Sequence, residues 1–222
     1  MSCNIAIDGP AGAGKSTIAK RVAAQLGFIY VDTGAMNRAV GVYMLDHQVD
    51  IKDLDAVKAA LEQISVELTY EDGEQKVMLN GQCVNHRNRT EEAGMAASAF
   101  SAIGMVREKL LDLQRGLAAK TDVVMDGRDI GTHVLPNADC KIYLTASSKV
   151  RAERRYQELL LKGQEADLNQ IEEDIIARDH QDMTRAIAPL RQAEDALLVD
   201  SSYMNIDEVT ERILEIFREK TA

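Results

Sequence analysis

The first residues with an evident chemical use form a glycine-rich loop near the start of the chain. The loop consists of Gly9, Pro10, Ala11, Gly12, Ala13, Gly14, Lys15 and Ser16, and Thr17 follows it. This order fits the pattern G-x-x-x-x-G-K-[ST], in which backbone N–H groups surround a phosphate. Lys15 would reach the outer phosphates, and the Ser16 hydroxyl would ligate Mg²⁺. The loop therefore predicts ATP or GTP binding, but it does not say where the phosphoryl group goes.

A second stretch bears on the fate of that phosphoryl group. Val123–Asp126 is a short apolar run that ends in an acid, and Gly127 follows it. Many hydrolases with such a loop carry a glutamate directly after the acid to activate water, and GTPases read guanine with Asn-Lys-x-Asp. This sequence has neither signal. Asp126 would hold Mg²⁺ or its waters, unless it only caps the end of a strand. The pattern favours transfer to an acceptor over hydrolysis.

Three arginines near predicted strand ends and helix starts indicate the charge of the acceptor. They are Arg38, Arg107 and Arg128. Guanidinium groups bind phosphate oxygens with paired hydrogen bonds, although a single arginine is as often a solvated surface residue. Because the formal net charge of the chain is −10, an anionic ligand needs a local cluster of positive groups. We therefore expect an acceptor that is itself anionic.

Composition excludes several other classes of function. An acidic surface repels polyanions, so we expect no nucleic-acid partner. The cysteines Cys3, Cys83 and Cys140 are odd in number and widely spaced, which argues against a disulfide framework and a zinc site. The uncharged stretch 93–106 is too short to span a bilayer, and a first strand beginning at Asn4 leaves no room for a targeting peptide. We expect a cytoplasmic protein with no membrane partner.

The elements that must position these residues alternate along the chain. Short apolar runs predict strands at 4–8, 28–31, 123–126, 141–145 and 196–200. Helical spacing and capping residues predict helices at 15–26, 35–46, 54–64, 91–120 with a break near Gly104, 147–162, 168–183 and after Asn205. Five buried strands separated by helices indicate an α/β fold with a parallel sheet flanked by helices.

A smaller sheet is predicted near the middle of the chain. Val66–Tyr70 and Lys76–Leu79 alternate in polarity and flank Asp72-Gly73, and Asn80-Gly81 leads into Gln82–Val84. Turn dipeptides between alternating runs indicate hairpins. We therefore expect a small antiparallel insert in this region.

Four segments together carry a recognisable pattern. They are Asp8–Thr17, Val31–Met36, Asp126–Thr132, and a run that contains Arg178, Asp179, Asp182, Arg185 and Pro189-Leu190. These segments resemble the bacterial cytidylate kinase family, and the resemblance covers nearly the whole chain. The P-loop is shared widely, whereas Asp-Gly-Arg-Asp-x-Gly and Arg-Asp-x-x-Asp-x-x-Arg are specific to that family among nucleoside monophosphate kinases. The resemblance implies transfer of the γ-phosphoryl group of ATP to CMP or dCMP, with Mg²⁺.

The same resemblance implies how the chain is organised. It predicts one P-loop kinase domain over residues 1–222, which contains a core, a nucleotide-monophosphate-binding region that holds the β insert, and a short helical lid. The core is expected at 1–34, 121–150 and 192–222, the binding region at 35–120, and the lid at about 156–190.

The resemblance also assigns residues to the two nucleotides. ATP is expected to contact Gly9–Thr17 together with Arg151 and Arg155. CMP is expected to contact Thr33, Arg38, Ser98, Arg107, Arg128, Asp129, Arg178, Asp182 and Arg185. Ser98 and Asp129 match positions that hydrogen-bond cytosine, and Asp182 matches one that meets the sugar hydroxyls. The expected catalytic residues are Lys15, Arg128, Arg178 and Arg185, and the expected metal positions are Ser16 and, through water, Asp126.

One position departs from the family pattern. The family usually has a tyrosine between Met36 and Arg38, and this chain has Asn37. An aromatic ring would supply a packing surface near CMP that an asparagine cannot supply. We therefore expect the substitution Asn37→Tyr to tighten CMP binding.

The expected mechanism needs no general base. The second pKa of a phosphate monoester is about 6, so the acceptor oxygens are largely ionised at neutral pH. Alignment and charge neutralisation must then supply the catalysis, with a lid at 168–185 excluding water. We expect a monomer, because such kinases open and close. Two alternatives stay open: a kinase of a small hydroxylated metabolite with Asp32 as base, and a non-catalytic module that senses ATP.

Overall fold

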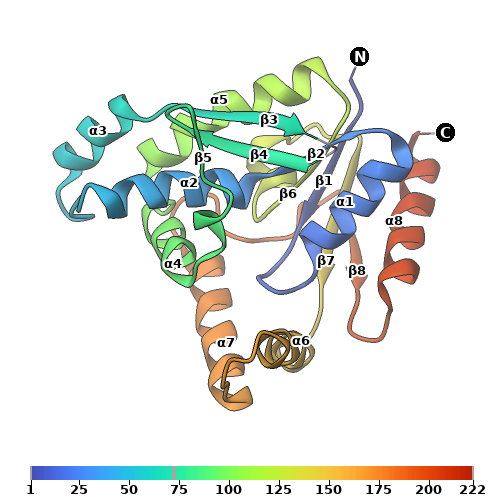
Figure 1. Cartoon of the computed structure of the whole chain (residues 1–222). Coiled ribbons are helices and arrows are strands. Elements are labelled where there is room, and N and C mark those ends of the chain that lie inside the picture. Colours follow the sequence, from blue (N-terminus) through green and yellow to red (C-terminus); the bar gives the residue numbers. More distant parts are fainter. Residues whose placement is uncertain (1, 72–73, 222) are drawn as a thin grey trace. The chain divides into compact units, whose positions relative to one another are not determined.

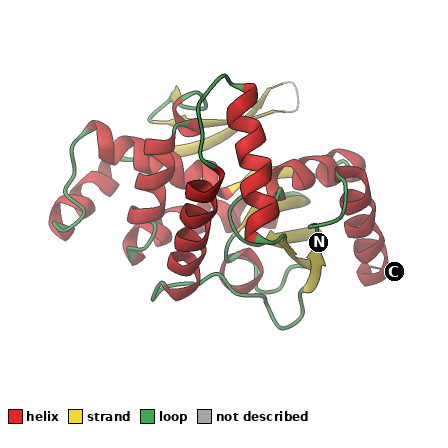
Figure 2. Cartoon of the chain, turned by 90° about the horizontal axis from the view of Figure 1, so that it is seen from below, coloured by secondary structure: helices red, strands yellow, loops and turns green. Residues whose placement is uncertain are grey.

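The computed structural model describes residues 2–71 and 74–221, which divide into two compact units. The P-loop unit comprises the chain up to Tyr30 and from Thr121 onward, and the inserted unit is Val31–Lys120. Figure 1 labels the elements of both units, and Figure 2 shows them by type of secondary structure. Each unit is built from its own elements as follows.

A five-stranded sheet forms the centre of the P-loop unit. Its strands are β1 (Asn4–Asp8), β2 (Ile29–Asp32), β6 (Val123–Gly127), β7 (Cys140–Thr145) and β8 (Leu197–Asp200). The last two residues of β2, Val31 and Asp32, are counted with the inserted unit. Their order is β2-β6-β1-β7-β8, and β1 pairs in parallel with both β6 and β7. The central strands are buried along most of their length, as continuous apolar runs predict. The predicted parallel sheet is confirmed.

Two helices cover one face of this sheet. They are α1 (Lys15–Leu26) and α8 (Ile206–Thr221), which pack together and on the strands. Ile18 and Val22 of α1 join Ile213 of α8 in one buried cluster with β1. Asn205 and Glu208 form the predicted capping box, because each side chain accepts a hydrogen bond from the backbone N–H of the other.

Two further helices of the P-loop unit lie in the region where a lid is expected. They are α6 (Ser148–Leu161) and α7 (Leu168–Thr184), and they pack side by side (Figure 1). Ser147 caps α6 and Asp167 caps α7 through their side-chain oxygens. The structure contains one element that the sequence did not predict, a short π-helix at Ile130–Val134, shortly after β6.

The inserted unit combines helices with the predicted small sheet. It contains α2 (Thr33–Asp46), α3 (Leu54–Gln63), a 3₁₀ turn at Arg87–Arg89, α4 (Glu91–Phe100) and α5 (Gly104–Lys120). The break predicted near Gly104 is confirmed. At Gly41 of α2, a Cβ would lie 2.9 Å from the backbone nitrogen of Ala97 in α4, so the absent side chain lets these helices approach closely.

The antiparallel insert is also confirmed. Its strands are β3 (Val66–Glu71), β4 (Glu74–Leu79) and β5 (Gln82–Cys83), in that order. Asn80 and Gly81 both have positive φ, 48° and 78°, as a tight hairpin turn requires. The other predicted turn, Asp72-Gly73, lies outside the described residues. Within the described ranges, no helix has the length and apolar composition that a membrane crossing needs.

Candidate active site

The glycine-rich loop joins β1 to α1, which is the position that its sequence predicts. Gly9, Gly12 and Gly14 all have positive φ, at 151°, 75° and 86°. A Cβ on Gly9 would lie only 1.9 Å from the carbonyl oxygen of Leu144 in β7, so no other residue fits there. The loop therefore leads from a buried strand into a helix N-terminus, a combination that favours bound anions.

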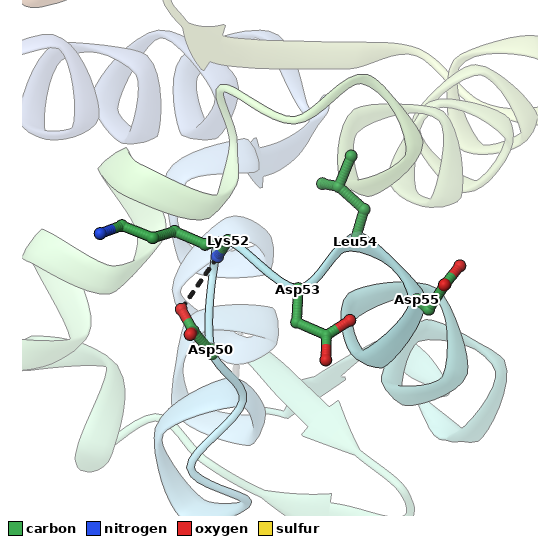
Figure 3. Close-up of a pocket in the computed structure, with 5 residues that line it drawn as sticks. All are labelled: Asp50, Lys52, Asp53, Leu54 and Asp55. Carbon is green, nitrogen blue, oxygen red and sulfur yellow. Dashed lines mark hydrogen bonds between the residues drawn. The ribbon is translucent and has the colours of Figure 1, made fainter.

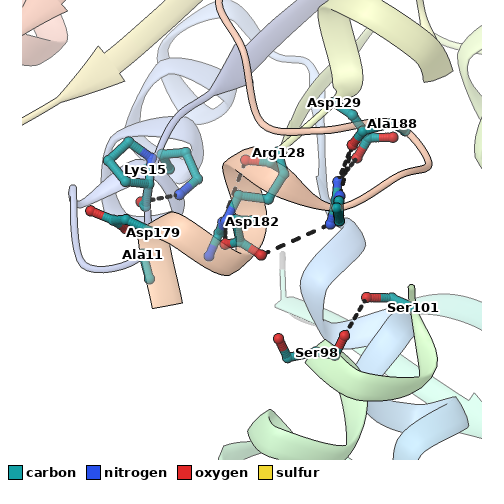
Figure 4. Close-up of polar contacts among 12 residues, drawn as sticks. Ala11, Lys15, Ser98, Ser101, Arg128, Asp129, Asp179, Asp182 and Ala188 are labelled. Carbon is teal, nitrogen blue, oxygen red and sulfur yellow. Dashed lines mark hydrogen bonds and ion pairs between the residues drawn. The ribbon is translucent and has the colours of Figure 1, made fainter. Parts of the chain in front are cut away.

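The Lys15 side chain folds back onto the loop. It is buried, and its Nζ donates a hydrogen bond to the carbonyl oxygen of Pro10 at 2.7 Å (Figure 4). Burial lowers the pKa of Lys15 to about 7, and the neighbouring Arg128 guanidinium contributes in the same direction. An anion bound in the loop would oppose both effects, because it stabilises the ammonium form.

Ser16 and Asp126 place two side-chain oxygens that could ligate a metal close to the loop. The Ser16 hydroxyl donates to Oδ2 of Asp126 at 2.9 Å, and the Tyr30 hydroxyl donates to Oδ1 at the same distance. A hydroxyl and a carboxylate are the ligands that Mg²⁺ prefers when it keeps several waters. Among the described residues, no group of three His, Cys, Asp or Glu side chains is arranged for an all-protein metal cage. The pair therefore fits a cation such as Mg²⁺, which in kinases is shared between a few protein oxygens and phosphates.

Asp8, which sequence reasoning did not single out, anchors the segment after β6. Its carboxylate accepts hydrogen bonds from the backbone N–H groups of Ile130 at 2.8 Å and Gly131 at 2.7 Å. Burial raises the pKa of Asp8 to about 6, although the two N–H donors favour the charged form. The only sequence signal for this role is an acid at the end of a buried strand. Asp8 fixes the turn that follows Arg128 and Asp129.

Four charged side chains of the P-loop unit form one network. Arg128 donates from Nε to Asp182 at 2.9 Å, and Arg185 donates from Nη2 to Asp129 at 3.3 Å (Figure 4). Arg185 also lies 3.9 Å from Asp182. The side chains of Asp129, Asp182 and Arg185 are each exposed by 10% or less. The structure thus brings together four of the residues that the family resemblance assigns to CMP.

The other arginines of α6 and α7 that the resemblance assigns to the nucleotides have different surroundings. Arg178 is exposed on α7, one turn before Asp182. Arg155 is exposed on α6 and pairs with Glu158 at 3.0 Å. Arg151 is buried and bonds to the loop itself, through the carbonyl oxygen of Ala11 at 2.9 Å.

In the inserted unit, the predicted residues at the start of α2 are held by short-range contacts. Asp32 caps the helix by accepting from the Ala35 N–H at 2.8 Å, and its other oxygen lies 3.2 Å from Nη2 of Arg38. Thr33 is buried in the first turn. Asn37 donates from its amide nitrogen to the carbonyl oxygen of Thr33 at 2.9 Å. Arg38 is therefore oriented by a carboxylate of its own unit.

A second group of predicted residues lies where α4 meets α5. The Ser101 hydroxyl donates to the carbonyl oxygen of Ser98 at 3.2 Å (Figure 4), and Arg107 donates from Nη1 to the carbonyl oxygen of Ser101 at 3.3 Å. Ser98 and Arg107 are both partly buried. Sequence reasoning missed Ser101, which joins these two positions.

A surface hollow in the inserted unit contains none of the predicted site residues. It is lined by Asp50, Lys52, Asp53, Leu54 and Asp55 (Figure 3). Asp50 accepts from the backbone N–H of Lys52 at 2.9 Å, and Asp53 caps α3 through the N–H of Ala56. Asp50 therefore stabilises the turn between α2 and α3, and Asp53 stabilises the start of α3.

Comparison with known proteins shows which family the sequence matches. The family model described as Cytidylate kinase matches residues 5–219. A curated cytidylate kinase from Caldicellulosiruptor bescii is 50% identical over 214 residues, which are 96% of this chain and 95% of that protein. One from Lactobacillus gasseri is 49% identical over 216 residues, 97% of this chain and 94% of that protein.

A solved structure extends the likeness to the fold. The crystal structure of an uncharacterized protein from Eubacterium ventriosum matches with a TM-score of 0.53 at 12% sequence identity and covers 99% of both chains. At that identity the likeness concerns the fold alone.

Proposed function

Because the chain belongs to the cytidylate kinase family, and so transfers the γ-phosphoryl group of ATP to CMP or dCMP, we propose which of its residues hold the two nucleotides. The observation that carries the assignment is the placement of Lys15 and the network of Arg128, Asp182, Arg185 and Asp129 in one unit. Such an arrangement supplies positive groups for two anionic ligands within an acidic protein.

ATP binds in the loop from Gly9 to Thr17. The positive φ values of its glycines and the N-terminus of α1 support this assignment. Lys15 leaves the carbonyl oxygen of Pro10 and pairs with the outer phosphates, so its ammonium form is restored. Arg155 is assigned to the ATP side as well; its exposure on α6 makes it accessible to a ligand.

Nine residues are assigned to CMP or dCMP on the basis of the family resemblance. They are Thr33, Arg38, Ser98, Arg107, Arg128, Asp129, Arg178, Asp182 and Arg185. Asp129 accepts a hydrogen bond from the cytosine amino group, which uracil lacks. A buried carboxylate left without that donor would penalise UMP, so the enzyme rejects it.

Ser16 and Asp126 are the residues that would hold Mg²⁺, Ser16 through its hydroxyl and Asp126 through a water. When bound, the ion would supply charge neutralisation for the phosphates. The hydrogen bond between the two side chains and the oxygen-only donor set support the assignment.

The chain's own residues accelerate transfer by alignment and charge. The acceptor oxygens are ionised at neutral pH, so no side chain removes a proton from CMP. Lys15, Arg128, Arg178 and Arg185 stabilise charge on the transferring group. Asp32 is not needed as a base, and its two oxygens are engaged by the Ala35 N–H and Arg38.

An acceptor screen tests the function. Purified protein with ATP and Mg²⁺ should release ADP with CMP and dCMP, much less with UMP, and none with shikimate-like hydroxyl acceptors. ADP release with the hydroxyl acceptor alone would favour a small-metabolite kinase, and ATP binding without ADP release would favour a sensing module. Lys15→Met should lower transfer by about 10²-fold or more, as loss of an oriented charge does.

We propose a cytoplasmic monomer. The three free cysteines support a reducing compartment. Light scattering of the eluted protein at assay concentration should give the mass of one 24.5 kDa chain, and a dimer mass would contradict the monomer.

A further inference from the structure

Arg151 connects three segments of the P-loop unit through one guanidinium group. Its Nε donates to the carbonyl oxygen of Ala146 at 2.9 Å, and Nη1 donates to the carbonyl oxygen of Ala11 at 2.9 Å. The carboxylate of Asp179 in α7 accepts two hydrogen bonds from the same guanidinium, from Nη1 at 3.1 Å and from Nη2 at 2.5 Å. The side chain of Arg151 is only 5% exposed and that of Asp179 14%.

The contact with Ala11 determines which way a peptide group of the loop faces. In a trans peptide the carbonyl and the following N–H point in opposite directions. Holding the Ala11 carbonyl toward Arg151 therefore turns the N–H of Gly12 away from Arg151. Gly12 has a φ of 75°, and a Cβ there would sit 3.5 Å from the Arg151 Cβ, so Arg151 packs against one side of the loop. The Gly12 N–H is thus directed to the other side, where a phosphate is expected.

We propose that Arg151 is a positioning residue for ATP: together with Asp179, it holds the Ala11 carbonyl so that the loop presents the Gly12 N–H to a phosphate. This inference rests on the proposed binding of ATP by Gly9–Thr17. It also ties α7, which carries Asp182, to the ATP loop. The role differs from the direct contact with ATP that the family resemblance implies for Arg151.

The hydrogen bonds of Arg151 support positioning over direct contact. A guanidinium has five N–H donors, and the hydrogen bonds to Ala146, Ala11 and Asp179 occupy four of those of Arg151. Moving Arg151 onto a phosphate would leave Asp179 as a largely buried carboxylate without its fork, which is strongly unfavourable. Lysine could not replace Arg151, because a point charge cannot reach three separate acceptors with this planar geometry.

The test compares Arg151→Lys, Asp179→Asn and the double variant. We expect each single variant to weaken the Kd of ATP, measured by calorimetry without CMP, by about 10-fold. The KM for ATP should rise by a similar factor, while kcat and the KM for CMP change by less than about twofold. The double variant should bind ATP no more weakly than the single variant that binds it less well, because both substitutions break the same Arg151–Asp179 ion pair.

A second readout separates positioning from simple stabilisation. The backbone ¹⁵N resonance of Gly12 should shift in Arg151→Lys. The Gly12 nitrogen shares a peptide group with the Ala11 carbonyl, which loses its hydrogen bond from Arg151 in that variant. The control Arg218→Lys, which alters an exposed pair with Glu211, should leave the Gly12 resonance and the Kd of ATP unchanged. A lowered Tm in Arg151→Lys with an unchanged Kd of ATP would overturn the proposal. So would a weakened Kd in Arg151→Lys that Asp179→Asn does not reproduce.

The Lys15→Met variant distinguishes this failure from a failure of the proposed site. If Lys15→Met binds ATP normally, the loop is not the ATP site. If Lys15→Met weakens ATP binding and Arg151→Lys does not, the loop assignment stands and the role of Arg151 is wrong.

Discussion

Asp182 holds Arg128 by accepting a hydrogen bond from its Nε at 2.9 Å, and the Asp182 side chain is only 9% exposed. The family resemblance assigns Asp182 to the sugar hydroxyls of CMP, yet its carboxylate here orients an arginine assigned to the CMP phosphate and base. A carboxylate can accept several hydrogen bonds at once. Both roles are therefore compatible, because Asp182 can orient Arg128 and still accept hydrogen bonds from sugar hydroxyls.

Replacing Asp182 by asparagine tests that contact. The amide removes the negative charge that orients Arg128, so we expect kcat/KM for CMP to fall by about 10²-fold while the Kd of ATP stays within about twofold. Steady-state kinetics and ATP calorimetry check this. The control is Asp207→Asn, which removes an exposed ion pair with Arg21 and should change neither value. Equal losses for ATP and CMP would contradict a role confined to the acceptor side.

The elements that position the site are largely predictable, because short-range patterns encode them. A strand that ends at Asp8, a Gly-rich turn and a helix from Lys15 follow directly from apolar runs and the motif. The turn at Asn80-Gly81 follows from the need for positive φ at both residues. The same patterns predict a break near Gly104, where α5 begins.

The partner of each charged group is much harder to predict. Asp8 meets Ile130 and Gly131, which are more than a hundred residues away in the sequence, and Arg151 meets Asp179. No local periodicity reports which carboxylate an arginine reaches, because the pairing is decided by the packing of distant elements. Motifs indicate candidate site residues but leave open which groups of the protein those residues contact.

The pKa of Lys15 makes ATP binding depend on pH in a defined direction. Burial lowers the pKa of Lys15 to about 7, so the side chain is mostly neutral at pH 8, and bound phosphates would raise that pKa again. We expect net uptake of up to about one proton per ATP bound at pH 8. Calorimetry in buffers with different ionisation enthalpies measures this number. The Lys15→Met variant should take up fewer protons per ATP bound than the parent protein. Equal proton uptake in the two proteins would rule out Lys15 as the group that titrates.

The same shift has a consequence for stability. Between pH 7 and the ordinary lysine value of 10.5, the unfolded chain binds more protons at this position than the folded chain does. The contribution of Lys15 to the free energy of unfolding therefore rises with pH across that window. Urea titrations at pH 7 and pH 9 should show a smaller rise in Lys15→Met than in the parent protein.

Base selectivity is expected to depend on Asp129. Asp129→Ala removes the acceptor for the cytosine amino group, so the ratio of kcat/KM for CMP over UMP should fall by about 10-fold or more. The Kd of ATP should change much less. Because Asp129 also pairs with Arg185 at 3.3 Å, turnover with both acceptors will fall too, and the ratio isolates the part due to the base. An unchanged ratio would remove Asp129 from base recognition.

Asn37 provides a test in the opposite direction, a substitution that should improve binding. Its amide nitrogen donates to the Thr33 carbonyl oxygen one turn earlier in α2, at 2.9 Å, so the side chain is folded along its own helix. A tyrosine cannot make that bond and would instead offer an aromatic surface beside Arg38. We expect Asn37→Tyr to lower the Kd of CMP by about 3- to 10-fold, which is the range of a single aromatic contact. Titration with CMP, with Asn37→Ala as the control for loss of the amide alone, measures the effect. If Asn37→Tyr binds CMP no better than Asn37→Ala does, a ring at this position does not contribute to the CMP site.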